Sequence, residues 1–437
     1  MARKHIYDDG AGYTALRRYI TPFIRLSYRS FHVVGLDKIP TDGSLILVSN
    51  HTGSVMDPFV QLAALRRKVV FMARADVFRK PFVAKLLYFF RILPVYRIRD
   101  GFSAVKGNDK IIAEAVEVLR SRTPLALYPE GTHRTRHSLL RLSKGVFHIA
   151  LNAERQIEGE WPVYIVPMGI EYGDYFRFRP TMEMEVGDPI RVDRFVSEYY
   201  AANAAAGEEQ NEARLINAFR ERLCEALQPL ITYIPDDEDY EAIWELVKLR
   251  TSHRVPLSAE RRKRYNQEEV ARLLVMRGQQ PEAFAELADR ALAFRAERKR
   301  PHVSVFSTFT TRPEIIAPWA LLKTLILLLL APAYLFCGIV SAPTWIIGAT
   351  LAGRAKDETW RNTWRFAPHF ILTPLLTLLA AVFTFGKLPW VAALCFTLLT
   401  LFAIPIVYDW AEQFRRVCSS WAWLFRPRLR QQLKTLL

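Results

Sequence analysis

The sequence is poor in cysteine and in acidic side chains. Only 44 Asp and Glu stand against 60 Lys and Arg among the 437 residues, which gives a formal net charge of +16. So large a positive excess indicates an anionic partner, either nucleic acid or an anionic membrane surface. The cysteines lack the paired spacing of a metal site, and they predict no disulfide framework. They are Cys224, Cys337, Cys395 and Cys418.

The first residues lack a long apolar run. Residues 1–9 are polar, so we expect no cleaved signal peptide. Residues 1–30 interleave arginines with bulky apolar side chains, a pattern typical of an amphipathic N-terminal segment that lies in a membrane interface. Because Pro22 interrupts the pattern, an amphipathic helix packed on the neighbouring domain is an equal alternative.

Short apolar segments alternate with helix-like segments from residue 31 to residue 195. This alternation predicts an α/β domain. The expected strands are 31–34, 45–49, 69–73, 92–96, 125–128, 163–168 and 182–186, and the expected helices are 81–90, 108–121 and 143–155. Residues 182–186 alternate Met and Glu, which predicts a half-exposed edge strand.

The composition changes twice after this domain. Residues 196–312 are charged and favour helix, which predicts a helical connector or cap. Within 315–410, the stretches 366–385 and 389–408 carry no charged residue and are long enough to cross a bilayer as a hairpin. Residues 315–353 are also apolar but are interrupted by Lys323, Pro332 and Pro343, so we expect a re-entrant or proline-broken hairpin. Residues 411–437 form a basic tail.

A histidine follows the second expected strand. His51 lies directly after the apolar run 45–48, and Asp57 comes six residues later, before Pro58. An imidazole with a carboxylate beside it can act as a general base near neutral pH. Asp57 is also well placed to be only the N-cap of a helix that begins at Pro58. The two side chains can meet if the intervening residues form a loop, which Gly53 favours.

A second polar motif, Glu130-Gly131-Thr132, also follows a short apolar strand. Gly131 allows close backbone approach, Thr132 offers a hydroxyl, and the following Arg134 and Lys144 offer charge-assisted bonds to a phosphate. We expect Glu130 to orient a basic neighbour or a substrate hydroxyl. A solvated basic loop is the alternative interpretation of this segment.

Four segments together resemble the ordered sequence blocks of the glycerolipid acyltransferases, which include the 1-acylglycerol-3-phosphate and glycerol-3-phosphate acyltransferases. The blocks are residues 50–58, 94–101, 128–132 and 165–169, and the resemblance covers about residues 30–190. It implies the core of that family, a mixed sheet flanked by helices. It also implies roles for residues of this chain: His51 as general base, Asp57 as its orienting acid, Arg97, Glu130 and Gly131 in a glycerol-phosphate site, and Val166 and Pro167 in an acyl-site strand.

This chain departs from the common pattern of the family at two places. Five residues separate His51 from Asp57, where four are usual, and similar spacing occurs in a branch that includes fungal-type glycerol-3-phosphate/dihydroxyacetone-phosphate acyltransferases. His133 stands between Thr132 and Arg134, where an arginine usually follows the threonine directly.

The expected function is that of a membrane-bound O-acyltransferase. It would move an acyl chain from acyl-CoA or acyl carrier protein to 1-acyl-sn-glycerol-3-phosphate and give phosphatidic acid. Glycerol-3-phosphate or dihydroxyacetone phosphate is the alternative acceptor, another lysophospholipid comes third, and a non-catalytic membrane scaffold is the alternative of a different class. No Ser or Cys nucleophile lies in the blocks, so direct attack by a hydroxyl deprotonated by His51 is expected. No metal, bound cofactor or nucleic-acid partner is expected.

Basic residues also flank the apolar segments unevenly. They gather between residues 354 and 365 and again after Tyr408, whereas Lys387 alone lies in the turn of the second hairpin. Positive residues favour the cytoplasmic side of a membrane. We therefore expect the acyltransferase domain, the 354–365 loop and the C-terminus all to face the cytoplasm.

Overall fold

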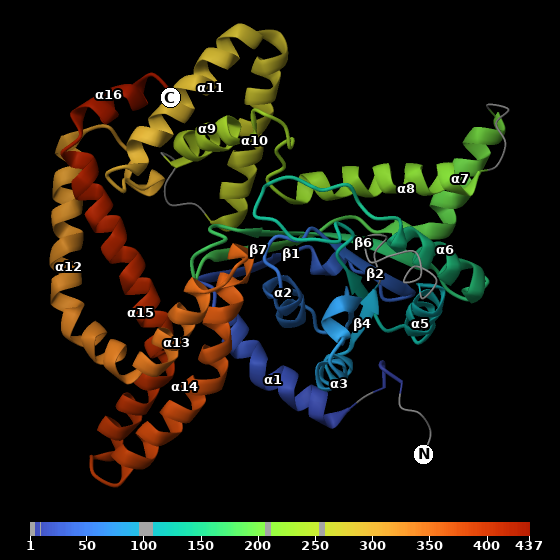
Figure 1. Cartoon of the computed structure of the whole chain (residues 1–437), viewed down its shortest axis with the longest axis horizontal. Helices are drawn as coiled ribbons and strands as arrows, with labels where there is room; N and C mark the ends of the chain where they lie inside the picture. The colour runs from blue at the N-terminus through green and yellow to red at the C-terminus, as the bar shows by residue number, and fades with distance from the viewer. Residues whose placement is uncertain (1–4, 9, 96–107, 206–210, 253–257) are drawn as a thin grey trace. The chain divides into compact units, whose positions relative to one another are not determined.

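The computed structural model describes residues 5–8, 10–95, 108–205, 211–252 and 258–437 (Figure 1). The chain divides into two compact units. The first unit comprises residues 1–25, 30–175 and 182–231, and the second comprises residues 26–29, 176–181 and 232–437. The segment expected to be one connector, 196–312, is therefore divided between the two units.

The described residues include one mixed sheet of eight strands. The strands are β1 (Ser30–Val34), β2 (Ser44–Ser49), β3 (Val70–Arg74), β4 (Ile92–Val95), β5 (Leu125–Leu127), β6 (Val163–Tyr172), β7 (Thr181–Val186) and β8 (Ile190–Arg191). Their order is β1-β7-β6-β2-β5-β3-β4, with β8 also paired to β6. The five strands β6, β2, β5, β3 and β4 are parallel, and β7 and β8 run antiparallel to β6. The prediction of a mixed α/β sheet is confirmed.

The helices of the first unit cover this sheet. They are α1 (Ala11–Leu26), α2 (Met56–Ala64), α3 (Pro81–Phe89), α5 (Asn108–Arg120), α6 (Gly145–Ile157), α7 (Val192–Ala205) and α8 (Glu212–Leu227). Every residue of β2 is buried, as is usual for a central parallel strand covered on both faces. Phe219 and Leu223 of α8 join the same core as Val48 and Phe147, so α8 is part of the first unit.

The prediction that residues 182–186 form a half-exposed edge strand is wrong. β7 lies between β1 and β6, and Glu183 on β7 is only 4% exposed. The Met-Glu alternation describes one strand alone. The strand that covers the outer edge of β7 is β1, which lies about 150 positions earlier in the chain. The Met-Glu alternation within 182–186 carries no information about this pairing.

Helix α1 packs on the first unit, which agrees with the second of its two alternatives. Tyr13 and Ile20 on its inner face are buried, and Pro22 lies within the helix without ending it. The Arg17 guanidinium donates to the carbonyls of Leu62, Leu65 and Arg66, and Arg25 donates to that of Ala63. These carbonyls end α2, so the two arginines cap its negative end.

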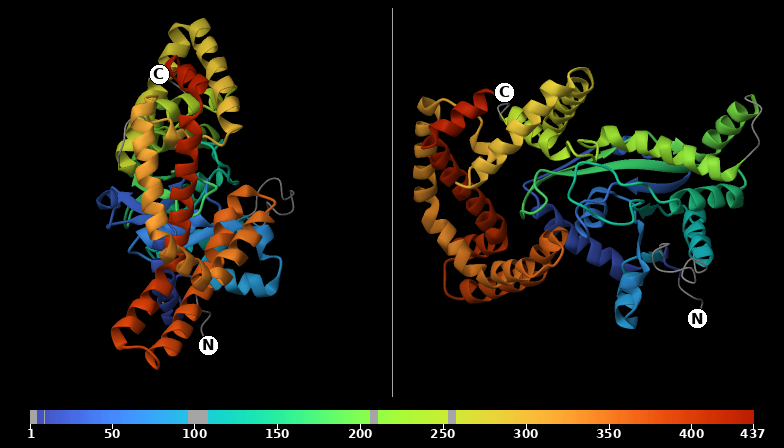
Figure 2. Two further views of the ribbon diagram at one scale, coloured as in Figure 1. Left: turned by 90° about the vertical axis from the view of Figure 1, so that its left-hand side faces the viewer. Right: turned by 45° about the horizontal axis from the view of Figure 1, so that its top comes forward.

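The second unit is helical (Figure 2). Its helices are α9 (Tyr240–Ser252), α10 (Ala259–Gln279), α11 (Pro281–Lys299), α12 (Pro313–Val340), α13 (Ala342–Gly353), α14 (Arg361–Phe385), α15 (Trp390–Leu424) and α16 (Pro427–Lys434). Helices α9, α10 and α11 share a core with Trp423 of α15 and Leu429 of α16. Helix α15 packs along both α12 and α14, and α13 packs on α14.

Among the described residues, three helical segments are long and apolar enough to cross a bilayer: Pro313–Val340, Glu358–Phe385 and Trp390–Leu424. Their apolar side chains are widely exposed, as Leu329 (79%) and Val382 (70%) illustrate. Such exposure suits a lipid environment, where apolar side chains need not be hidden from water. Within this unit, Asp409 accepts from Arg179 at 2.9 Å and Glu412 from Arg177 at 3.0 Å, where the apolar part of α15 ends.

Candidate active site

The loop that follows β2 carries His51. Just before it, the Asn50 side chain donates to the Ile170 carbonyl at 2.9 Å and accepts from the Ile170 amide at 2.7 Å. These two bonds continue the pairing of β2 with β6 beyond Ser49. The chain therefore enters the loop from a fixed position, and this position determines where His51 begins.

Asp57 holds the imidazole of His51. Its Oδ2 accepts from His51 Nδ1 at 2.8 Å and from the backbone amides of Thr52 and Gly53 at 2.9 and 2.8 Å. Its Oδ1 accepts from the Tyr172 hydroxyl at 2.6 Å. The Asp57 side chain is fully buried, whereas that of His51 is 17% exposed. With Nδ1 turned to the carboxylate, Nε2 is the ring nitrogen that a substrate can reach.

The structure differs from the expected cap. Helix α2 begins at Met56 with Val55 at its N-cap, so Asp57 lies in the first turn. Its side chain reaches back to the amides of Thr52 and Gly53 in the preceding loop. Asp57 therefore fixes the loop that carries His51, and the loop brings together two side chains that would face apart on a single helix.

Glycine at position 53 is required by this packing. A Cβ placed on Gly53 would lie 2.6 Å from Asp57 Oδ1 and 2.8 Å from Tyr172 Cε2. Neither neighbour has room to move, because Asp57 is fully buried and Tyr172 is 5% exposed. The small residue therefore allows the tyrosine and the carboxylate to close over the loop.

Aromatic rings define the orientation of the imidazole. The ring of Tyr128 stacks on His51 with centroids 4.4 Å apart and planes at 20°, and the ring of His133 meets it edge-on at 5.3 Å. Burial, followed by the nearby Asp57 charge, raises the pKa of Tyr128 well above its usual value, so the phenol stays neutral. Sequence reasoning assigned no role to Tyr128, His133 or Tyr172. Tyr128 and His133 lie beside the recognised motif, whereas Tyr172 is distant from it in sequence.

Glu130 connects the second motif to the first. Its Oε1 accepts from the His51 amide at 2.9 Å and its Oε2 from the Leu140 amide at 3.1 Å. Burial raises the pKa of this carboxyl, and the two backbone bonds partly oppose the rise. Both oxygens thus bind backbone amides, whereas the sequence led us to expect a basic side chain or a substrate hydroxyl as the partner.

The residues after Glu130 return to His51. Gly131 has a φ of 65°, a conformation that glycine adopts without strain, and Thr132 is half-buried. The Arg134 amide then donates to the His51 carbonyl at 3.2 Å, and its guanidinium donates to Ser138 Oγ at 2.9 Å. Gly131, Thr132 and Arg134 therefore lie on a loop joined at both ends to His51.

Four predicted site residues remain. Lys144 is exposed at the N-terminus of α6, which begins at Gly145, two residues later than expected. The Ser143 amide donates to the Pro129 carbonyl at 2.7 Å, which ties this helix start to the Glu130 loop. Val166 and Pro167 lie in β6 opposite Leu47 and Val48, and the role of this strand in acyl binding stays a prediction. Arg97 lies outside the described residues.

The two motifs meet because their strands are neighbours. β2 and β5 are parallel and adjacent, so their carboxyl ends open on the same edge of the sheet. In open α/β sheets this edge is where ligands bind. The result is a buried carboxylate, a partly exposed imidazole and a loop with a basic side chain, all held by backbone hydrogen bonds. This arrangement can remove a proton from a hydroxyl.

Comparison with known proteins identifies the fold family of this region. Residues 30–171 match the family model described as Acyltransferase. A stretch of 125 residues is 28% identical to a 1-acyl-sn-glycerol-3-phosphate acyltransferase of Borreliella burgdorferi, covering 29% of this chain and 48% of that protein. The chain thus spans about half the length of the curated relative it matches.

A solved structure is also similar. The 1-acyl-sn-glycerophosphate (LPA) acyltransferase PlsC from Thermotoga maritima is 20% identical, with 49% of this chain and 79% of that chain covered. The TM-score of the two structures is 0.32. The family match includes both His51 and Asp57. Residues 30–171 therefore form an acyltransferase domain, as the family model describes it.

Proposed function

We propose that this chain is a membrane-bound O-acyltransferase that moves an acyl chain from a thioester to 1-acyl-sn-glycerol-3-phosphate and releases phosphatidic acid. The observation that carries the proposal is the 2.8 Å contact between His51 Nδ1 and the buried Asp57 carboxylate. A buried anion on one ring nitrogen stabilises the positive charge that develops when the other nitrogen takes a proton.

The reaction follows from this geometry. Nε2 of His51 takes the proton of the acceptor hydroxyl, whose oxygen attacks the thioester carbonyl carbon. A carbon–oxygen bond forms, the carbon–sulfur bond breaks, and the departing thiolate receives the proton from the imidazolium. The positioned base supplies about 10²–10⁴-fold in rate. Alignment of the hydroxyl with the thioester supplies much of the rest.

A phosphorylated acceptor suits the basic loop beside His51. Arg134 lies on this loop, Lys144 follows it at a helix N-terminus, and Arg97 is assigned to the phosphate site by family resemblance. Guanidinium groups bind phosphate with paired, charge-assisted hydrogen bonds. The name of the Borreliella burgdorferi relative favours 1-acyl-sn-glycerol-3-phosphate as the acceptor. Glycerol-3-phosphate is the second candidate, favoured by the five residues between His51 and Asp57.

An acceptor panel tests the proposal. The purified full-length chain in lipid nanodiscs is given labelled acyl-CoA or acyl carrier protein, with 1-acyl-sn-glycerol-3-phosphate, glycerol-3-phosphate, dihydroxyacetone phosphate or a lysophosphatidylcholine. We expect labelled phosphatidic acid as the main product, formed about 10²–10⁴-fold more slowly by His51→Ala. If the main product forms from glycerol-3-phosphate, then glycerol-3-phosphate is the acceptor in place of 1-acyl-sn-glycerol-3-phosphate. The absence of any acylated product, with correctly folded protein, would overturn the enzymatic proposal.

The proposed location is the membrane, with the acyltransferase domain and the basic C-terminal tail on the cytoplasmic side. This orientation requires α12 and α13 together to enter and leave the bilayer on one face, so that only α14 and α15 cross it as a hairpin. The charge asymmetry supports this orientation, because Lys387 is the only basic residue in the turn between α14 and α15. Cysteine accessibility tests this orientation. Single cysteines are placed in a cysteine-free variant at three exposed positions, Glu160, Gln432 and Gly386. An impermeant thiol reagent added to intact cells should label only the cysteine at position 386. Labelling at 432 with protection at 160 would contradict the orientation.

A further inference from the structure

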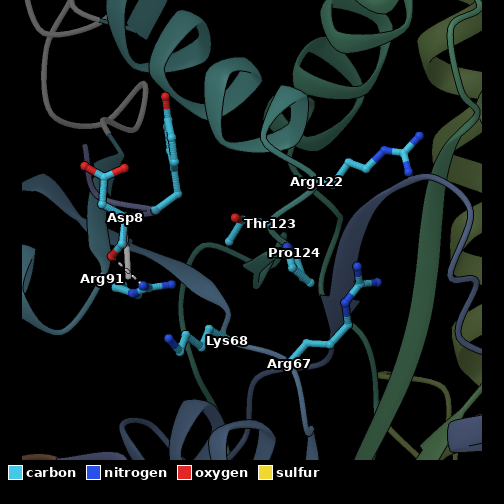
Figure 3. A pocket seen from close by; sticks show the side chains of 8 residues that line it. Asp8, Arg67, Lys68, Arg91, Arg122, Thr123 and Pro124 are labelled. Atoms are coloured by element: carbon cyan, nitrogen blue, oxygen red, sulfur yellow. Dashed lines mark hydrogen bonds between the residues drawn. The ribbon is translucent and has the colours of Figure 1, made fainter. Parts of the chain in front are cut away.

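A shallow basic cavity of about 490 Å³, wide open to solvent, lies at the amino ends of the parallel strands, opposite the ends that carry His51. Its lining includes Arg67, Lys68, Arg91 and Arg122 (Figure 3). These residues precede β3, β4 and β5, whereas His51 and Glu130 follow β2 and β5. Parallel strands rise about 3.3 Å per residue, so the length of a strand, roughly 10–20 Å, separates the two edges.

The three turns that form the cavity are joined to each other. The Val70 amide donates to the Pro124 carbonyl at 2.9 Å, and the Phe71 amide donates to the Arg91 carbonyl at 2.8 Å. The basic side chains therefore come from neighbouring turns of one rigid sheet edge. Figure 3 shows Arg67 and Arg122 on one side of the cavity and Arg91 on the other, with Thr123 and Pro124 between them.

Two of the arginines are held in place by aromatic rings. Arg91 is only 3% exposed, its guanidinium lies 4.7 Å from the Tyr13 ring centroid, and it donates to the Asp8 carbonyl at 2.7 Å. Arg122 lies 4.5 Å from the Trp161 ring centroid. Both residues have positive φ, 60° and 55°, because each stands just past the C-cap of a helix, α3 or α5, where the chain commonly adopts the left-handed conformation.

The charge balance favours an anion. Asp8 supplies the only carboxylate in the lining as described, and its Oδ2 accepts from the His5 amide at 2.6 Å. Arg67 and Arg122 are exposed on the same side of the cavity and repel each other, and an anion bound between them replaces this repulsion with attraction. A volume of 490 Å³ lies within the range of about 300–1,000 Å³ typical of small-molecule sites. It has room for more than a phosphate group.

We propose that this cavity is a second anion site, separate from the catalytic edge, that binds an organic phosphate with two or more negative charges. Arginine forks match the oxygens of a phosphate, and the polar wall of Thr123 adds a hydroxyl. Such a phosphate is found on a lipid headgroup with a terminal phosphate and on a soluble nucleoside diphosphate. Binding at this site does not depend on acyl transfer at His51.

Calorimetric titration of the detergent-solubilised full chain tests this site with two probes, ADP and dihexanoyl phosphatidic acid. We expect saturable binding of at least one probe. Its affinity should fall by at least about tenfold in Arg67→Gln/Arg122→Gln, equivalent to about 1.4 kcal/mol. The matched control is Arg66→Gln/Arg194→Gln, which removes the same charge from exposed positions outside the cavity and should leave the affinity unchanged.

The two probes identify the source of the phosphate. Binding of ADP alone indicates a soluble ligand, and binding of phosphatidic acid alone indicates a lipid headgroup. Arg67→Lys/Arg122→Lys keeps the charge but loses the forks, so its affinity should lie between wild type and the Gln variant. If the Gln variant fails to fold, the affinity of the Lys variant tests the role of the two guanidinium groups. Failure of both probes to bind, or equal weakening in the cavity and control variants, would overturn the proposal.

Discussion

The Tyr172 hydroxyl donates to Oδ1 of Asp57 at 2.6 Å, across 115 positions of sequence. The other oxygen of Asp57 is occupied by His51 and two backbone amides. Tyr172 is thus a positioning residue, since it acts on the imidazole only through the carboxylate. We expect Tyr172→Phe to lower kcat by about tenfold, the equivalent of about 1.4 kcal/mol, with KM for both substrates nearly unchanged.

Steady-state kinetics check this split between kcat and KM. Tyr164→Phe is the matched control, because Tyr164 lies on the same strand and its hydroxyl meets exposed Asp42 at 3.3 Å. It should retain wild-type activity. An equal loss of kcat in both variants would show that the strand, and not the bond to Asp57, is responsible.

His51→Ala removes the base and should reduce kcat by about 10²–10⁴-fold. Asp57→Asn should also be severely impaired, because a neutral amide cannot stabilise the imidazolium and its nitrogen cannot accept from the loop amides. Single-turnover acyl transfer measures both variants, and circular dichroism verifies the fold. More than about a tenth of wild-type kcat in His51→Ala would exclude general-base catalysis of this size.

Gly53→Ala should inactivate the enzyme without touching a catalytic group. The added methyl would lie 2.6 Å from Asp57 Oδ1, so the loop must shift, and displacement by about 1 Å can cost about 10²-fold in rate. Gly145→Ala is the control, because a Cβ there meets no atom within 4 Å. The acyl-transfer rates of the two variants should differ by that factor. Equal rates would mean that the loop adapts to the methyl group.

Glu245 should stabilise the second unit in a pH-dependent way. Burial raises the pKa of its carboxyl, but Lys248 and Arg298 outweigh this effect and hold the pKa below the ordinary value of 4.5. The Glu245 side chain is fully buried, and Oε1 lies 2.5 Å from Arg298 Nη2. Removal of one partner of a buried pair costs about 3–5 kcal/mol, so Glu245→Gln should lower Tm clearly at neutral pH.

The direction of the pH effect follows from the lowered pKa. The contribution of Glu245 is fully present above pH 4.5, the ordinary value, and is lost as the pH falls through the lower folded-state value. The difference in Tm between wild type and Glu245→Gln should therefore shrink in acid. Glu286→Gln, in an exposed pair with Arg290, should change stability by only about 0–1 kcal/mol at any pH. A constant difference across pH would contradict this account.

Local sequence patterns predicted the strands well because burial leaves a local signature. The uninterrupted apolar run of β2 gives its position almost to the residue. Pairing order is different, since nothing within residues 182–186 reveals that β1 lies beside β7. The starts of two helices, at Met56 and Gly145, also differ from the expected positions by two residues, because neither N-cap residue makes a side-chain hydrogen bond that the sequence could reveal.

Part of the site was predictable because some of its residues are close together in the sequence. His51 and Asp57 are close in sequence and share a recognisable motif, so their meeting required only a loop between them. Tyr172 and Ile170 approach from a strand more than 110 residues away, and only the sheet register brings them to Asp57 and Asn50. Glu130 was expected to orient a basic side chain or a substrate hydroxyl, but its partners are backbone amides, which no side-chain pattern reveals.

The capping of α2 by α1 has a mechanical consequence. α2 has nine residues and is about 13 Å long, too short to bend appreciably. Asp57 lies at the start of α2, and at its other end Arg17 and Arg25 donate hydrogen bonds to the carbonyls of Leu62 and Ala63. A displacement of α1 would therefore move α2 and the carboxylate that orients His51. The alignment of the catalytic base is in this way linked to the seating of the chain's first helix.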